Sequence, residues 1–262
     1  MKYRRNNKHA FSSIAQAMSN LLPKLVLIPL VDLVIADAKP IVSIFQSNFK
    51  SEQISCDDWA IGELIGKPIQ EVIHTMCHRS RANCSEDKIL TLTKNITHQL
   101  NAYFGTNTNN AHTKEVDIFL HSLQGKGIKV GLTSWLSKET TQIALKAANL
   151  LDRIDCFSHF SAGYHHGTSP DIIFTLMRQM GISNNEHVAN LGKSKYDALR
   201  GYHAQCKWNI LIAEDKENVR WNAYPNTAIV GSLREATAEI LSKSAGSDFF
   251  KILNNKNRKR GK

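Results

Sequence analysis

Gly192-Lys-Ser-Lys-Tyr-Asp197-Ala-Leu-Arg-Gly201-Tyr-His-Ala204 is the stretch that decides the fold. The apolar segment directly before it, residues 188–191, has the length and composition of a buried strand. The polar turn after that segment leads into a helix that contains Asp197. A strand, a turn and a helix in this order form the repeating unit of a parallel sheet.

The same unit occurs elsewhere in the chain. Further apolar strands are expected at residues 25–28, 128–132 and 210–213. The first of these ends at Pro29, and the second runs into Thr133, Ser134 and the next helix. Strands that alternate with helices predict an α/β fold with a doubly wound parallel sheet, in which ligands bind at the carboxyl ends of the strands.

A helical insert is expected after the first strand, because residues 40–110 show apolar positions at helical spacing and no strand pattern of similar strength. The expected organisation has five parts. They are a basic N-terminal extension (1–23), a core in two pieces (24–39 and 111–245), a helical cap (40–110) and a basic C-terminal tail (246–262).

The composition limits the class of protein. With 262 residues, of which 42% are hydrophobic, the chain can bury the core of a large α/β domain. Its formal net charge of +10 favours anionic partners in general. The two ends carry much of that charge and are expected to be solvated tails, so nucleic acid is not expected as a partner.

Hydropathy and cysteine usage bear on the compartment. No apolar run approaches the roughly 20 residues of a membrane-spanning helix, so no membrane span is expected. The five cysteines are Cys56, Cys77, Cys84, Cys156 and Cys206. An odd number spread over a long chain favours reduced thiols over a disulfide framework, and hence a cytoplasmic location.

Three segments together resemble the haloacid dehalogenase superfamily, and within it the branch of the phosphonoacetaldehyde hydrolases. The stretch from Gly192 to Ala204 resembles Gly-Asp-Thr-Pro-Asn-Asp-Leu-Glu-Ala-Gly-Arg-Asn-Ala of that superfamily. Gly167-Thr-Ser-Pro-Asp-Ile-Ile173 resembles the Gly-Arg-Pro-x-Pro-Asp-x-Ile run of the branch, and Lys126 to Trp135 resembles its strand ending in Ser or Thr. The resemblance covers residues 24–241 and implies the superfamily's core with a cap inserted after the first strand.

The resemblance also implies that the catalytic groups have been replaced. Members use an aspartate at the end of the first strand as nucleophile, and Pro29 stands at that position. The acid/base aspartate of the phosphatases falls on Val31, and the carboxylate of the third motif that binds Mg²⁺ falls on Lys193. The basic residue that steadies the transferring group falls on Thr168.

Two family positions keep a usable side chain. Ser134 matches the hydroxyl of the second motif, and Asp197 matches the second aspartate of the third motif. Asp197 is expected to form an ion pair with Lys193. Because Lys193 would repel a cation, neither a metal nor another cofactor is expected.

A shifted register is the main alternative. Asp32 or Asp37 follows the first strand, and either one would be a displaced nucleophile of an active, Mg²⁺-dependent hydrolase of phosphonates or phosphate esters.

Other groups of side chains predict a functional site less clearly. A zinc site would use His74, Cys77, His78 and Cys84, but ordinary surface histidines are the preferred interpretation. Lys67 is two residues from the position of the branch's Schiff-base lysine, which is Ile69 here, and is expected to be a surface lysine. His165 and His166 are expected to be exposed loop residues, and Trp135 is expected to pack against the cap.

The sequence therefore predicts a catalytically inactive or attenuated member of the fold that acts by binding. One version is a pocket formed by Thr133, Ser134 and Lys193, which would bind a phosphorylated or phosphonate small molecule. The other version is a protein partner.

Overall fold

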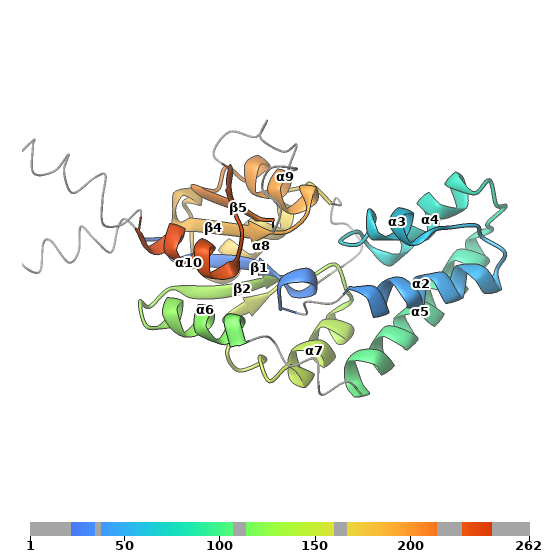
Figure 1. Cartoon of the computed structure of the whole chain (residues 1–262), viewed down its shortest axis with the longest axis horizontal. Helices are drawn as coiled ribbons and strands as arrows, with labels where there is room; N and C mark the ends of the chain where they lie inside the picture. The colour runs from blue at the N-terminus through green and yellow to red at the C-terminus, as the bar shows by residue number, and fades with distance from the viewer. Residues whose placement is uncertain (1–21, 35–37, 107–113, 160–166, 214–226, 243–262) are drawn as a thin grey trace, which may run out of the picture.

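The computed structural model describes residues 22–34, 38–106, 114–159, 167–213 and 227–242, with the side chains of Asp32 and Ser242 excepted (Figure 1). Its centre is a six-stranded parallel sheet with the order β3-β2-β1-β4-β5-β6. The strands are β1 (Leu25–Pro29), β2 (Lys129–Thr133), β3 (Cys156–Phe157), β4 (Val188–Gly192), β5 (Trp208–Ile212) and β6 (Thr227–Val230). The predicted α/β class and parallel sheet are confirmed.

Both faces of the sheet are covered, and β1, β4 and β5 are accordingly buried and largely apolar, with Asn190 and Asn209 as the polar exceptions. Val26 and Ile28 point to one face, where they join the cluster of α6 (Lys114–Gln124) and α10 (Leu233–Ser242). Leu25 and Leu27 point to the other face and pack with α8 (Asp171–Gln179), while α9 (Lys195–His203) lies against β4 and β5. The sheet is therefore doubly wound.

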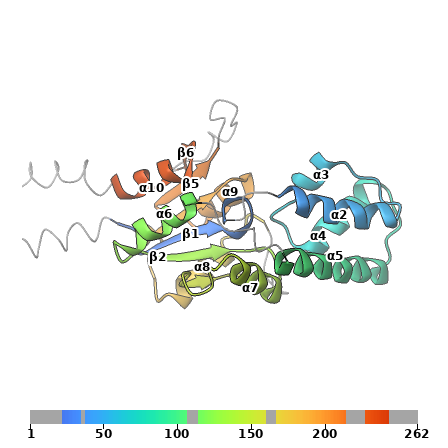
Figure 2. The ribbon, with the colours of Figure 1, turned by 60° about the horizontal axis from the view of Figure 1, so that its bottom comes forward.

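The predicted helical insert after the first strand is also confirmed. It consists of α2 (Lys39–Ser51), α3 (Asp58–Gly62), α4 (Ile69–Arg79) and α5 (Glu86–Thr106). These helices bury their own apolar side chains, among them Phe45, Phe49 and Phe104, and α5 packs against α7 (Lys138–Ala147) of the core. In both ribbon views the cap forms one end of the molecule, and β1 and β2 run toward it (Figures 1 and 2).

Some local features of the structure were not predicted from the sequence, and one expectation stays untested. The segment after β1 continues as a π-helix, Leu30–Val34, whose apolar side chains are buried. The strands β3 and β6 were not predicted. The basic ends lie outside the described residues.

The expectation of five reduced thiols is wrong for two of them. Cys77 lies in the last turn of α4, and the chain turns back through Arg81, which has a φ of 55°. This turn brings the Cα of Cys84 to 6.2 Å from that of Cys77, and a disulfide joins them. The cysteine argument for a reducing compartment loses its force accordingly.

Among the described residues, no helix is long and apolar enough to cross a membrane.

Candidate functional site

The carboxyl ends of β1, β2 and β4 form the candidate site. Pro29 pairs in register with Thr133 of β2, and β4 lies along the other side of β1. Lys193 directly follows Gly192, the last residue of β4, and its side chain is exposed. The strand order therefore brings Pro29, Thr133, Ser134 and Lys193 to the same edge of the sheet.

Ser134 is buried in a hydrogen-bonded turn between β2 and α7. Its N–H donates to Ser158 Oγ at 3.0 Å, and its Oγ accepts from the N–H of Leu136 at 3.2 Å. The same Oγ lies 2.9 Å from the hydroxyl of Thr141. When Thr141 donates, Ser134 keeps its own proton for an anion at the strand end, because a hydroxyl has one donor and two acceptor sites.

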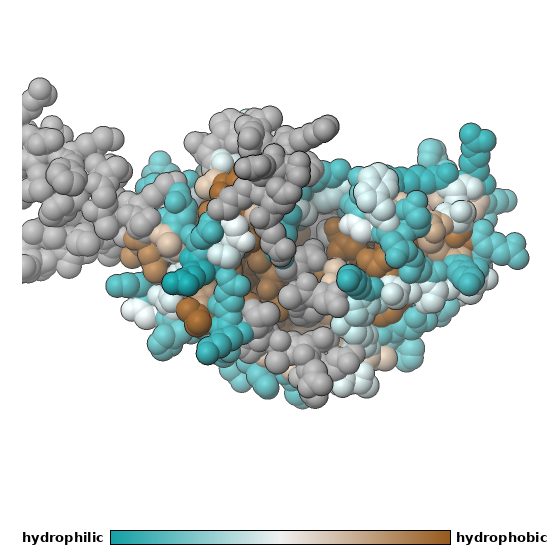
Figure 3. All heavy atoms as spheres, viewed as in Figure 1, coloured by the Kyte–Doolittle hydropathy of each residue, from teal (hydrophilic) through white to brown (hydrophobic). Residues whose placement is uncertain are grey.

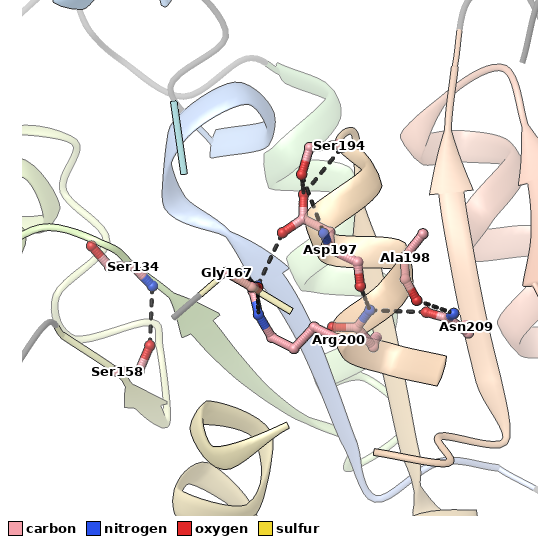
Figure 4. A network of polar contacts seen from close by, with 9 residues as sticks. Ser134, Ser158, Gly167, Ser194, Asp197, Ala198, Arg200 and Asn209 are labelled. Atoms are coloured by element: carbon pink, nitrogen blue, oxygen red, sulfur yellow. Dashed lines mark hydrogen bonds and ion pairs between the residues drawn. The ribbon is translucent and has the colours of Figure 1, made fainter. Parts of the chain in front are cut away.

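Asp197 has structural partners on both of its carboxylate oxygens (Figure 4). One oxygen accepts from the N–H of Ser194 at 3.2 Å and from its hydroxyl at 2.7 Å, and the Ser194 hydroxyl accepts in turn from the N–H of Asp197. This capping box begins α9. The other oxygen accepts from the guanidinium of Arg200 at 3.0 Å.

The expected ion pair between Asp197 and Lys193 is therefore wrong. Arg200 lies three residues further along α9, on the same face as Asp197, and is itself buried. Lys193 precedes the N-cap residue Ser194 and is not on that face.

Arg200 also holds the loop that contains Thr168. Its Nε and Nη2 atoms donate to the carbonyl of Gly167 at 3.2 and 3.0 Å. The Nδ1 of His203 lies 2.9 Å from the carbonyl of Thr168. Thr168, where the resemblance predicts the loss of a basic residue, is thus held to α9 through the backbone of its loop.

Two glycines of the third motif are required by close packing. A Cβ on Gly192 would lie 2.0 Å from the Cβ of Asp197, and a Cβ on Gly201 would lie 2.0 Å from Asn209 Oδ1. Asn209 accepts from Asn190 at 2.9 Å, and each amide also donates to a carbonyl of α9. The motif therefore fixes α9 tightly on β4 and β5.

The cap approaches α9 through Lys67, which precedes α4 and follows Gly66, a residue with a φ of 101°. Lys67 pairs with Glu71, and its Nζ lies 5.6 Å from the ring centre of Tyr196 in α9. Trp135, directly after Ser134, contacts Phe45 of the cap with ring centres 6.4 Å apart, which confirms its predicted packing. Hydrophobic residues are visible on the neighbouring sides of core and cap (Figure 3).

The residues of the site do not fit Mg²⁺. This ion prefers several oxygen ligands, whereas the side chain of Pro29 has no donor atom and that of Lys193 has a positive charge. The carboxylate of Asp197 is already bound by Ser194 and Arg200. No group of three or more His, Cys, Asp or Glu side chains suited to a metal occurs in the described part of the chain.

The thiols do not supply a nucleophile. Burial raises the pKa of both Cys156 and Cys206 to about 12. Burial and then the neighbouring charges of Asp57 and Asp58 raise the pKa of Cys56. The zinc hypothesis loses two of its ligands to the disulfide between Cys77 and Cys84.

The remaining candidates are not all described. The backbone of Asp32 lies in the π-helix, and Asp37, His165 and His166 lie outside the described residues. Sequence reasoning missed Tyr196 and the role of Arg200. The role of Arg200 could have been found, because Asp197 and Arg200 are three residues apart on a predicted helix and such residues lie on the same face.

Comparison with known proteins supports one superfamily. The family model of haloacid dehalogenase-like hydrolases matches residues 31–210. A haloacid dehalogenase-like hydrolase from Bacteroides fragilis is 18% identical with a TM-score of 0.70, over 82% of this chain and 99% of that one. A β-phosphoglucomutase from Clostridium difficile is 14% identical with a TM-score of 0.72, over 85% and 97%.

The CbbY protein from Rhodobacter sphaeroides, in complex with xylulose-1,5-bisphosphate, is 14% identical with a TM-score of 0.66, over 82% of this chain and 96% of its own. At these identities the structures show a shared fold alone. No curated protein matches the chain. The family model covers more than half of the sequence, and the chain therefore belongs to the haloacid dehalogenase-like hydrolases.

Proposed function

We propose that this protein has lost the metal-dependent hydrolysis of its family, or keeps it only in attenuated form, and acts by binding. The observation that carries the proposal is Pro29 at the end of β1, beside Thr133 and on the strand that adjoins β4. A proline ring has no lone pair with which to attack phosphorus or carbon, so no covalent intermediate can form there.

A small phosphorylated or phosphonate molecule is the preferred ligand. Lys193 stands at the end of β4 with an exposed ammonium group, where the family places a carboxylate. This exchange changes the local charge from −1 to +1 and so favours an anion without a metal. The hydroxyl of Ser134 supplies a hydrogen bond on the opposite flank.

The chain is further proposed to belong to the phosphonatase-like branch. Gly167 and the run up to Ile173 support this, since the run leads into α8 as a short polar turn that ends at Pro170. The Schiff-base chemistry of that branch is not part of the proposal, because Ile69 occupies the lysine's place and is buried.

Isothermal titration calorimetry on the full chain tests the pocket. We expect inorganic phosphate and methylphosphonate to bind without added metal, and Lys193→Ala to weaken both at least tenfold. Lys207→Ala is a matched control, since Lys207 is an exposed lysine that directly precedes β5, at the opposite end of the strands. Absence of binding at millimolar ligand would remove the small-molecule version and leave a protein partner.

A turnover screen tests the alternative of an active hydrolase. The wild-type chain is assayed with Mg²⁺ against phosphonates and phosphate esters, beside Asp32→Asn and Asp37→Asn. Turnover that is abolished by either substitution would establish a displaced nucleophile and refute the loss of hydrolysis.

A further inference from the structure

Two adjoining hollows form one groove on the cap. The first, of about 610 Å³, lies along α2 and the segment after it, and the second, of about 470 Å³, lies beside α3 and the last turns of α4. Both are lined by Ser55 and Cys56, which lie between α2 and α3. Because these two residues belong to both hollows, the groove is continuous.

The groove is separate from the candidate site at the strand ends. Every residue that lines it lies between Ser43 and Arg79, within the cap, and none belongs to the core. Arg79 is the last residue of α4, whereas Lys67, before the first turn of that helix, is the residue that approaches α9 of the core. The groove therefore shares no residue with the proposed pocket for a small anion.

The part of the groove beside α3 is apolar and open to solvent. Trp59 is 71% exposed, the largest exposed fraction of any large hydrophobic residue in the described part of the chain. It lines the groove together with Ala60 and Met76. Aromatic residues, Met and Arg are enriched at protein–protein interfaces, and a Trp that packs against a partner can supply much of the binding energy. This part of the groove therefore suits a large apolar side chain of a partner.

Each hollow carries one positive charge with free donors. Lys50 is exposed and has no ion-pair partner within the described residues. Arg79 approaches Glu63 only to 3.7 Å, and 43% of its side chain is exposed, so its guanidinium keeps donors for a second carboxylate. Asp57, the acidic residue of the lining, already accepts from the N–H of Ala60 at the start of α3. The groove therefore favours carboxylates.

Neutral side chains of the groove can bind a peptide backbone. Gln46, Gln53 and Ser55 line it, and none of these side chains has a hydrogen-bond partner among the residues that the structure describes. Each residue of an extended peptide other than proline brings one N–H and one C=O, and a side-chain amide or hydroxyl can bind either. A peptide can therefore be held along α2 by its backbone while its side chains reach the charged and apolar places.

The walls of the groove are fixed before a partner binds. Cys77 lies between Met76 and Arg79, and its disulfide to Cys84 ties the end of α4 to the segment that leads into α5. On the other wall, the side chain of Asp57 caps α3 two residues before Trp59. A preformed surface loses less conformational freedom on binding, which favours affinity.

We propose that this groove docks an extended segment of an acidic partner protein, in which a large apolar side chain is flanked by carboxylates. The apolar side chain packs against Trp59 and Met76, and the carboxylates pair with Lys50 and Arg79. The net charge of +10 on the chain favours the approach of an acidic partner. This inference goes beyond the binding of a small anion and does not depend on it.

Selection from a displayed library of short random peptides tests the groove, with the full, unreduced chain as the target. Enriched peptides should contain a large apolar residue with Asp or Glu on both sides. Their synthetic versions should bind in fluorescence polarisation, and replacing the two acids by Lys should weaken binding by more than about tenfold. Trp59→Ser and Arg79→Gln should each raise the Kd about tenfold, as expected for central interface residues. Lys50→Gln should also weaken binding, and by more at low salt than at high salt.

Matched controls remove the same kinds of side chain elsewhere. Arg178 is an exposed arginine in the last turn of α8, as Arg79 is in the last turn of α4. Ile118 on α6 is a large hydrophobic residue that is 57% exposed, and Lys94 on α5 is an exposed lysine. Arg178→Gln, Ile118→Ser and Lys94→Gln should leave the affinity for the selected peptides unchanged.

Several outcomes would overturn the proposal. One is that no peptide is enriched, or that the enriched peptides lack acidic residues. Another is binding that survives both Trp59→Ser and Arg79→Gln, because the peptides would then bind elsewhere. Self-association in analytical ultracentrifugation that Trp59→Ser abolishes would assign the groove to a second copy of this chain instead. The phosphate titrations above depend on Lys193, so the anion-binding function and this inference stand or fall separately.

Discussion

The substitution Asp197→Asn separates a structural from a catalytic role for the third motif. The sequence resemblance of the third motif implies an active-site role for Asp197. Here its carboxylate accepts from Ser194 at the start of α9 and pairs with Arg200 at 3.0 Å. We therefore expect the substitution to lower the free energy of unfolding.

The free energy of unfolding is expected to fall by about 3 kcal/mol. This is the lower end of the range for removing one partner of a buried ion pair. The side chains of Arg200 and Asp197 are 6% and 12% exposed, so the guanidinium would keep its charge in a poorly solvated place. The lower end applies because Arg200 retains two hydrogen bonds to the carbonyl of Gly167. The total free energy of unfolding of a domain of this kind is about 5–15 kcal/mol, so the variant should still fold.

Urea unfolding followed by circular dichroism measures the loss. Ser194→Ala removes only the cap and should cost about 1 kcal/mol. Arg200→Met removes the charge but keeps an apolar stem, and the double variant with Asp197→Asn should be more stable than the sum of the single effects predicts.

If Asp197→Asn changed the free energy of unfolding by less than about 0.5 kcal/mol, the structural role of the carboxylate would be refuted, because an ordinary surface substitution has an effect of that size. Additive effects in the double variant would refute the direct pairing with Arg200.

Three further predictions concern packing and thiols. Gly201→Ala should cost more than about 3 kcal/mol in urea unfolding, because its Cβ would lie 2.0 Å from Asn209 Oδ1, whereas Gly62→Ala has nothing within 4 Å and should be neutral or stabilising. Titration with a thiol reagent in denaturant should find three free thiols before reduction and five after it, since Cys77 and Cys84 form a disulfide; five before reduction would contradict the structure. The free energy of unfolding should fall as pH rises above 9, because the thiol of Cys206 ionises near pH 9.0 in the unfolded chain while burial raises its pKa to about 12 in the folded protein. Cys206→Ala should flatten that decline. An unchanged slope would count against the burial of this thiol.

The core strands were predictable because each is a short apolar run buried on both faces. β1, β4 and β5 are fully buried along their length, and their sequences show it. β3 has only two residues, too few for any pattern, and β6 is a half-buried edge strand whose apolar run, residues 228–230, has only three residues.

The candidate site was predictable in outline, because parallel strands end at the same edge of the sheet. That rule places Pro29, Ser134 and Lys193 together, but it says nothing about which side chains pair. Which side chains pair depends on where α9 begins. With Ser194 as the N-cap residue, Asp197 lies in the first turn of the helix and on the same face as Arg200.

The contact between Lys67 and Tyr196 was beyond sequence reasoning for a different reason. It joins residues more than a hundred positions apart and depends on how the cap lies over the core. No periodicity within either segment records that arrangement.

The positions that agree with the family and those that depart from it differ in what they do for folding. Gly192, Gly201 and Asp197 each make a close contact or a buried bond that fixes α9, so their loss would cost stability. Lys193 is exposed and has no ion-pair partner within the described residues, so the chain folds whether or not that position carries a carboxylate. The fold therefore does not depend on a carboxylate at that position, so membership of the family does not by itself require metal binding there.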